Sequence, residues 1–150
     1  MSYPMSLPPE VEEFLRTYGT EQIGRPLPRR WRRRHARTPG DCYAKAGRWC
    51  VGEPVMYTEG RALSGGLAER DWIPHAWLTA TDGGVIDLAR DEETLEATRY
   101  FGVRVPTLQV VTITRRQRPG HDARRVTSPL GPLLPELIRS GWTPAYADRA

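Results

Sequence analysis

The strongest constraint on the fold comes from two strand-forming segments that a tight turn joins. Residues 72–80 read Trp-Ile-Pro-His-Ala-Trp-Leu-Thr-Ala, and residues 85–88 read Val-Ile-Asp-Leu. Between them stands Asp82-Gly83-Gly84, a sequence that favours the turn of a β-hairpin. We therefore expect two antiparallel strands here. A high content of β-forming residues predicts further extended segments at 55–63, 100–105 and 107–114.

Helical patterns stand before and after these strands. In residues 8–18 apolar side chains recur every three or four positions, Ser6 can cap the segment and Gly19 can end it. A second helix is expected at 41–51, with Asp41 as its N-cap. Shorter helices are expected at 92–98 and 130–140. Helices followed by antiparallel strands predict an α+β fold rather than alternating βαβ units.

The chain has 150 residues, a length typical of one domain with its own hydrophobic core. We expect a single domain over residues 1–150 with its core at 41–114. Residues 24–40 carry prolines and many like charges, which predicts a flexible or extended basic segment. Residues 115–150 are expected to form a C-terminal extension.

The composition favours a soluble protein of the cytoplasm. No apolar run approaches the roughly 18 residues of a membrane span. Residues 1–4 have neither the basic nor the apolar region of a secretory signal. In the cytoplasm Cys42 and Cys50 are expected to stay reduced. On one helix they would also lie about 12 Å apart along the axis, too far for a disulfide.

Three residues form a candidate nucleophilic site. Cys42 stands in the first turn of the predicted second helix, where free backbone N–H groups and the helix dipole favour a thiolate. His75 lies within a predicted strand and can serve as the base, and Asp87 on the returning strand can orient it. A turn centred near Gly83 places His75 opposite a residue near 91, but the even spacing of His75 and Asp87 allows them to share one face.

The order of short motifs in residues 41–106 resembles a known superfamily. The motifs are Asp41-Cys42-Tyr43, Tyr57-Thr58-Glu59-Gly60, Pro74-His75-Ala76-Trp77-Leu78, Val85-Ile86-Asp87 and Tyr100-Phe101-Gly102-Val103. Together they resemble the papain-like and transglutaminase-like thiol superfamily, and more closely a group of uncharacterised bacterial and phage proteins.

This resemblance implies a papain-like fold in which an N-terminal helix and a cysteine-bearing helix pack on an antiparallel sheet. It implies Cys42 as nucleophile, His75 as general base and acid, and Asp87 as the orienting residue. The expected reaction is hydrolysis of an amide, thioester or isopeptide bond, or acyl transfer from it, without a cofactor. The backbone N–H of Cys42 would be one oxyanion donor, and the side chain of Gln22 is a candidate for another.

The chain departs from the expected pattern at two positions. Lys45 stands where the group is expected to have Asn, and Leu88 stands where Pro is expected. Lys45 can stabilise a thiolate by its charge, or it can be an ordinary solvated residue. Tyr43, Lys45 and Trp77 are candidates for lining a substrate cleft.

The same three residues also have a structural interpretation. Free cysteine is often buried as a small apolar residue, which is the role expected of Cys50. His75 can be a satisfied core histidine, and Asp87 can anchor the end of a hairpin. A metal site is not expected, because the two Cys and three His have no short ligand spacing.

The chain is basic, with a net charge of +4 and a pI near 9.4, and its arginines are most concentrated at residues 25–37. This segment contains seven Arg around Trp31, a composition that suits phosphate contacts or an acidic protein partner. The candidate binding residues are Arg29, Arg30, Trp31, Arg32, Arg33 and Arg34. An alternative function is therefore a non-catalytic papain-like binding module that uses this segment for nucleic acid or an acidic partner.

Overall fold

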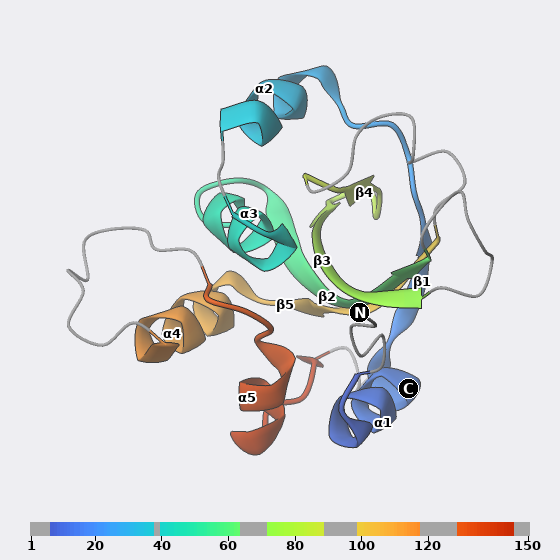
Figure 1. The fold of residues 1–150 in the computed structure, drawn as a ribbon, viewed down its shortest axis with the longest axis vertical. Coiled ribbons are helices and arrows are strands. Elements are labelled where there is room, and N and C mark those ends of the chain that lie inside the picture. Colours follow the sequence, from blue (N-terminus) through green and yellow to red (C-terminus); the bar gives the residue numbers. More distant parts are fainter. Residues whose placement is uncertain (1–6, 38–39, 64–71, 89–98, 118–128, 146–150) are drawn as a thin grey trace, which may run out of the picture.

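A five-stranded antiparallel sheet forms the centre of the computed structural model, which describes residues 7–37, 40–63, 72–88, 99–117 and 129–145. Its order is β1-β5-β2-β3-β4, and it curls into an open half-barrel (Figure 1). The strands are β1 (Thr20–Ile23), β2 (Val55–Leu63), β3 (Trp72–Ala80), β4 (Val85–Ile86) and β5 (Arg99–Val105). Helices around an antiparallel sheet confirm the predicted α+β class.

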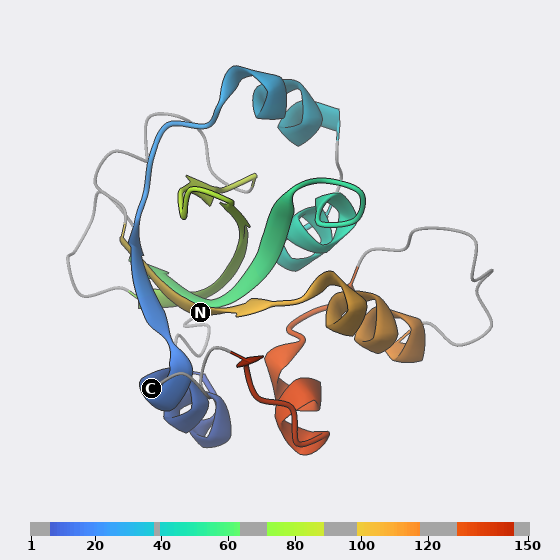
Figure 2. The same cartoon turned by 180° about the vertical axis from the view of Figure 1, so that it is seen from behind.

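The helices surround the sheet unevenly. They are α1 (Pro9–Tyr18), α2 (Arg29–Arg37), α3 (Cys42–Trp49), α4 (Thr107–Gln117) and α5 (Leu134–Arg139). Helices α1, α4 and α5 lie along the outer side of the curl, α3 lies beside β2 and β3, and α2 lies beyond α3 (Figure 1, Figure 2). Among the described helices, none is long and apolar enough to cross a membrane.

Most of the predicted elements are present. The helix at 8–18 is α1, which ends before Gly19, and the helix at 41–51 is α3. The remaining confirmed elements are the strands at 55–63, 72–80, 85–88 (as the shorter β4) and 100–105, and the last helix within 130–140. The expected cap Ser6 and the helix at 92–98 lie outside the described residues.

Two glycines permit close contact between β2 and β5. Gly60 pairs with Gly102, and a Cβ atom on Gly60 would lie 2.2 Å from the backbone oxygen of Phe101. A Cβ on Gly102 would lie 2.7 Å from both the Glu59 carbonyl oxygen and the Trp77 ring. Only glycine, which has no side chain, fits at these two positions. Strands β2 and β5 can therefore approach closely, and the Trp77 ring packs against their backbones.

Side chains from the β1 end of the sheet reach across the curl to the β3–β4 turn. Gln22 donates from Nε2 to the carbonyl oxygen of Gly83 at 2.8 Å. Arg25 donates to the carbonyl oxygen of Val85 at 3.2 Å and pairs with Asp82 at 3.0 Å. These contacts join the two edges of the sheet without a strand pairing between them.

The prediction of an irregular basic segment at 24–40 is wrong for the part that forms α2. The carbonyl oxygen of Pro28 accepts from the amides of the first helical turn, which begins the helix. Trp31 is 1% exposed, and its ring meets that of Trp49 edge-on with centroids 6.2 Å apart. Burial of this ring, together with ion pairs from helix arginines to Glu53, offsets the repulsion between like charges.

The predicted extended segment at 107–114 is also wrong, because these residues belong to α4. The carbonyl of Pro106 accepts from the amides of the first turn and begins the helix. Val110, Ile113 and Thr114 are buried, which is the three- and four-residue spacing of one helix face. Tertiary burial therefore overrides the strand preference of the β-branched residues.

The hydrophobic core extends beyond the expected limits of 41–114, so the description of 115–150 as an extension needs correction. A single buried cluster includes residues from both ends of the chain, namely Val11, Leu15, Trp31, Leu133, Leu134 and Leu137. The residues of α1 and those at the start of and within α5 cover the outer side of the sheet, whereas Trp31 packs against α3. A polypeptide limited to residues 41–114 would leave this apolar surface exposed.

A buried carboxylate joins the C-terminal helix to the sheet. Glu59 is 3% exposed and accepts hydrogen bonds from the backbone amides of Leu133 and Leu134 at 2.7 and 2.8 Å. The hydroxyl of Tyr57 donates to the same carboxylate. Burial raises the pKa of Glu59 to about 7, although these three hydrogen bonds favour the ionised form.

Replacing Trp31 by Ala should lower the free energy of unfolding by about 3–5 kcal/mol, because it leaves a cavity between α2 and Trp49. Urea denaturation measures this change. Arg33→Ala, in the same helix but exposed, is the control and should change the free energy by less than about 0.5 kcal/mol. Equal effects of the two substitutions would show that α2 is not packed into the core.

Replacing Gly102 by Ala should destabilise the protein by about 1–3 kcal/mol, because the added methyl group overlaps backbone and ring atoms. Gly131→Ala is the matched control, since no atom lies within 4 Å of the added methyl group. Thermal unfolding of both variants tests the expectation. A Gly102→Ala variant as stable as the control would contradict a close approach of β2 and β5.

Candidate active site

Helix α3 begins at Cys42, as its capping geometry requires. The side chain of Asp41 accepts a hydrogen bond from the amide of Ala44 at 3.0 Å, which confirms Asp41 as the N-cap. Gly40 precedes it with φ of 103°, a left-handed conformation that glycine adopts without strain. Cys42 is therefore the first helical residue, and its half-buried side chain lies at the positive end of the helix dipole.

His75 on β3 lies beside both of the other predicted site residues. Its Nε2 lies 2.8 Å from Oδ2 of Asp87, and the Cys42 side chain is near enough to the imidazole to raise the pKa of His75. Because Asp87 occupies Nε2, the nitrogen left for the thiol is Nδ1. The imidazole is thus the common neighbour of the Asp87 carboxylate and the Cys42 thiol.

Asp87 reaches His75 because the hairpin has a different register from the one expected of its turn. Thr79 pairs with Val85, whereas a symmetric turn centred near residue 83 would pair Thr79 with Asp87. Continuing the observed register places Asp87 opposite Trp77, which is two residues from His75 on the same face of β3. A diagonal neighbour at this distance is within reach of a side chain.

Tyr100 on β5 is a further member of this cluster, and the sequence analysis did not identify it. Its hydroxyl donates to Oδ2 of Asp87 at 2.7 Å, the same oxygen that contacts His75. Tyr100 and Asp87 are both fully buried. Alternation along β5 places Tyr100 on the same face of the sheet as Gly102. The sequence does not show that the Tyr100 hydroxyl meets Asp87, because that contact depends on the curl of the sheet.

The electrostatics of the cluster favour a protonated His75. Burial lowers the pKa of His75, but the Asp87 carboxylate and the Cys42 side chain raise it more, to about 9. The ring of Trp77 lies nearly parallel to His75, with centroids 6.2 Å apart, and covers it. A protonated His75 therefore places a positive charge beside the Cys42 side chain at the start of α3.

Gln22, the predicted second oxyanion donor, lies among other partners. Its side-chain oxygen accepts from Nε1 of Trp77 at 2.9 Å and from Oγ1 of Thr79 at 3.3 Å. Its Nε2 donates to Gly83 across the curl. These contacts hold the Gln22 side chain against β3 and the β3–β4 turn, and none of them joins it to Cys42.

The three candidate cleft residues differ in their surroundings. Trp77 is 1% exposed and packs against Tyr100 with ring centroids 4.8 Å apart. Tyr43 is half-buried, and its burial and the nearby charges of Glu59 and Cys42 raise its pKa. Lys45 is half-buried one turn after Cys42. Tyr43 and Lys45 therefore flank the thiol on α3, whereas Trp77 supports His75 from within the sheet.

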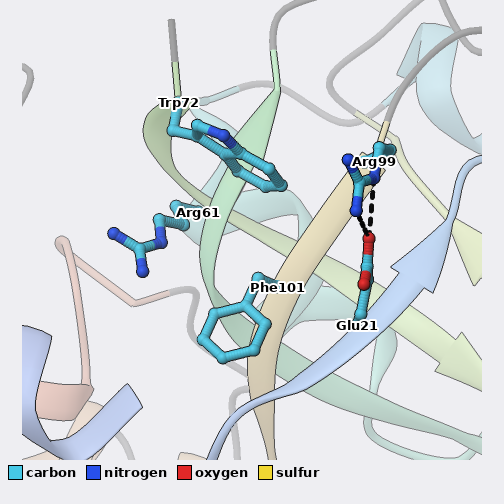
Figure 3. A pocket seen from close by; sticks show the side chains of 5 residues that line it. All are labelled: Glu21, Arg61, Trp72, Arg99 and Phe101. Carbon is cyan, nitrogen blue, oxygen red and sulfur yellow. Dashed lines mark hydrogen bonds and ion pairs between the residues drawn. The ribbon is translucent and has the colours of Figure 1, made fainter. Parts of the chain in front are cut away.

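A separate pocket of about 380 Å³ lies on the other face of the sheet (Figure 3). Its lining residues are Glu21, Arg61, Trp72, Arg99 and Phe101. Arg61 and Phe101 pair with each other and alternate with Gly60 and Gly102, so they point away from His75. The pocket is therefore not an entrance to the Cys42 site.

Comparison with known proteins gives no match for this chain, whether with family models, with curated proteins or with solved structures. The interpretation of the site therefore depends on its own geometry. Within the described residues, no group of three or more His, Cys, Asp or Glu side chains is arranged to hold a metal ion. The chemistry considered for the site is that of its thiol, imidazole and carboxylate.

The raised pKa of His75 predicts a specific dependence of stability on pH. Between its ordinary value of 6.5 and about 9, the folded protein keeps a proton that the unfolded chain has lost. The contribution of His75 is therefore complete below pH 6.5 and disappears as the pH rises to about 9, with a size on the order of 3 kcal/mol. Urea denaturation at about pH 6, 7.5 and 9 measures it.

The matched comparison is His75→Gln, which keeps all other titrating groups. The difference in unfolding free energy between wild type and this variant should shrink as the pH rises. A difference that stays constant from about pH 6 to 9 would contradict the ion pair between His75 and Asp87.

Proposed function

We propose that this chain is a papain-like thiol enzyme that cleaves or transfers acyl groups from an amide, thioester or isopeptide bond. The observation that carries the proposal is the convergence of Cys42, His75 and Asp87 from α3, β3 and the end of β4. The Cys42 side chain is half-buried, while His75 is 5% exposed and Asp87 is fully buried. The thiol is thus the accessible end of the cluster, as a nucleophile must be.

The reaction begins with the thiolate of Cys42 and the imidazolium of His75. The sulfur attacks the acyl carbon, and the negative charge that develops on the acyl oxygen faces the backbone amides at the start of α3. When the tetrahedral intermediate collapses, His75 gives its Nδ1 proton to the leaving amine or thiol. The products of this half-reaction are a thioester on Cys42 and the free leaving group.

The second half-reaction restores the enzyme. Neutral His75 removes a proton from water or an acceptor amine, which attacks the thioester carbon and displaces the Cys42 sulfur as a thiolate. Asp87 stays ionised and holds Nε2 of His75, so the ring keeps its orientation in both steps. Tyr100 contacts the carboxylate rather than the reacting atoms, and Trp77 covers the imidazole, so both act as positioning residues.

The experiment that tests this proposal compares the two cysteines of the chain. Burial raises the pKa of the Cys50 thiol to about 11, so Cys50 is an internal control with little thiolate near neutral pH. We expect iodoacetamide at about pH 7 to label Cys42 at least tenfold faster than Cys50, as measured by peptide mass spectrometry. His75→Gln should remove most of this difference, because the imidazolium is lost.

A second readout separates acyl transfer from mere thiol reactivity. With p-nitrophenyl acetate, wild type should form an acetyl thioester at Cys42, and Cys42→Ala should not. Labelling of Cys42 at the rate of an ordinary thiol, unaffected by His75→Gln, would overturn the proposal. Rapid alkylation without any acetylation would do the same for the acyl-transfer reaction.

A further inference from the structure

Helix α2 is firmly attached to the protein along one side. Trp31 is buried against Trp49 of α3, and the guanidinium of Arg34 lies 4.6 and 4.7 Å from the centroids of these two rings. Arg30 and Arg34 both pair with Glu53, at 3.3 and 2.5 Å. These contacts fix the orientation of the helix relative to α3.

The other side of α2 is basic and exposed. Arg29, Arg32 and Arg33 are exposed, and Arg29 and Arg33 are four residues apart on the helix surface. In the described part of the chain, no acidic side chain forms an ion pair with Arg29 or Arg33. Like charges at this spacing destabilise a helix, and a bound polyanion would relieve the repulsion.

The α3 residue Arg48 lies near the attached side of α2. Arg48 lies 4.9 Å from the ring centroid of Trp49, the same ring that Arg34 of α2 contacts. The nine residues of α2 extend over about 13 Å, and one nucleic-acid strand presents a phosphate about every 3.4 Å of its axis. The exposed side of the helix is thus long enough to meet about four phosphates.

The chemistry of this surface favours a nucleic acid over other anionic partners. The cations of α2 are all arginine, whose planar guanidinium forms paired hydrogen bonds with phosphate oxygens. A membrane-binding helix would need exposed apolar side chains, but the large apolar residue Trp31 faces the core. Phosphates follow one another along a nucleic-acid strand at a regular spacing, whereas the acidic side chains of a protein partner do not.

We propose that the exposed side of α2, formed by Arg29, Arg32 and Arg33, binds the phosphate backbone of nucleic acid. Because Trp31 of α2 is buried and not exposed for base stacking, the binding is independent of sequence. This proposal does not depend on the Cys42 site. Cys42→Ala is therefore expected to bind nucleic acid as wild type does.

Fluorescence anisotropy with a labelled 20-base-pair DNA duplex and its single strand tests the proposal, between about 50 and 200 mM NaCl. Wild type should bind, with an affinity that falls steeply as salt increases. The double variant Arg29→Gln/Arg33→Gln should bind on the order of tenfold more weakly at about 100 mM salt. The slope of log K against log salt should decrease in magnitude by about 2, one unit for each lost phosphate contact.

The control Arg16→Gln/Arg139→Gln removes the same charge from exposed positions on α1 and α5 and should bind as wild type does. Both double variants should fold as wild type does, because the contacts of Trp31 and Arg34 are unchanged. Circular dichroism checks this. Equal weakening in both double variants would mean a general charge effect and would overturn the proposal. The proposal would also be overturned if Arg29→Gln/Arg33→Gln bound DNA as tightly as wild type does. Stronger binding of wild type to polyglutamate than to DNA would overturn it as well.

Discussion

The close approach of β2 and β5 at Gly60 and Gly102 is the constraint on which the candidate site depends. No side chain fits between these backbones, and the ring of Trp77 occupies the space above them. The sheet can therefore curl into the open half-barrel that Figure 1 shows. The register of the β3–β4 hairpin brings Asp87 to His75, and both are buried, so water cannot compete for their hydrogen bond.

Among the described residues two carboxylates are buried, and each accepts hydrogen bonds from several donors. Asp87 accepts from His75 and Tyr100, whereas Glu59 accepts from Tyr57 and from two backbone amides at the start of α5. Burial of a charge is costly without such partners. The cost is offset differently in the two cases, because Asp87 faces an imidazolium while Glu59 has only neutral donors and a pKa near 7. Glu59 thereby makes the C-terminal helix part of the fold rather than an extension.

Local signals predicted those elements whose structure depends on local contacts. Asp41 caps α3 through a hydrogen bond three residues away, so the sequence was sufficient to predict it. The prediction failed at α2 and α4, where distant packing outweighs local preference. Charge repulsion disfavours α2 until Trp31 is buried, and β-branched residues disfavour α4 until Val110 and Ile113 meet the core. Tyr100 was missed as a site residue for a related reason, since no local pattern reveals the partner of its hydroxyl.

By itself the sequence determined the hairpin, the start of α3 at Cys42 and the strand that carries His75, because each depends on turn chemistry, capping or alternation over a few residues. Only the tertiary structure decided that Asp87 reaches His75, that Tyr100 joins it, and that Gln22 holds the curl rather than facing Cys42. These contacts depend on strand register and sheet curvature. Both arise from packing between residues far apart in the chain, and no short segment of sequence encodes them.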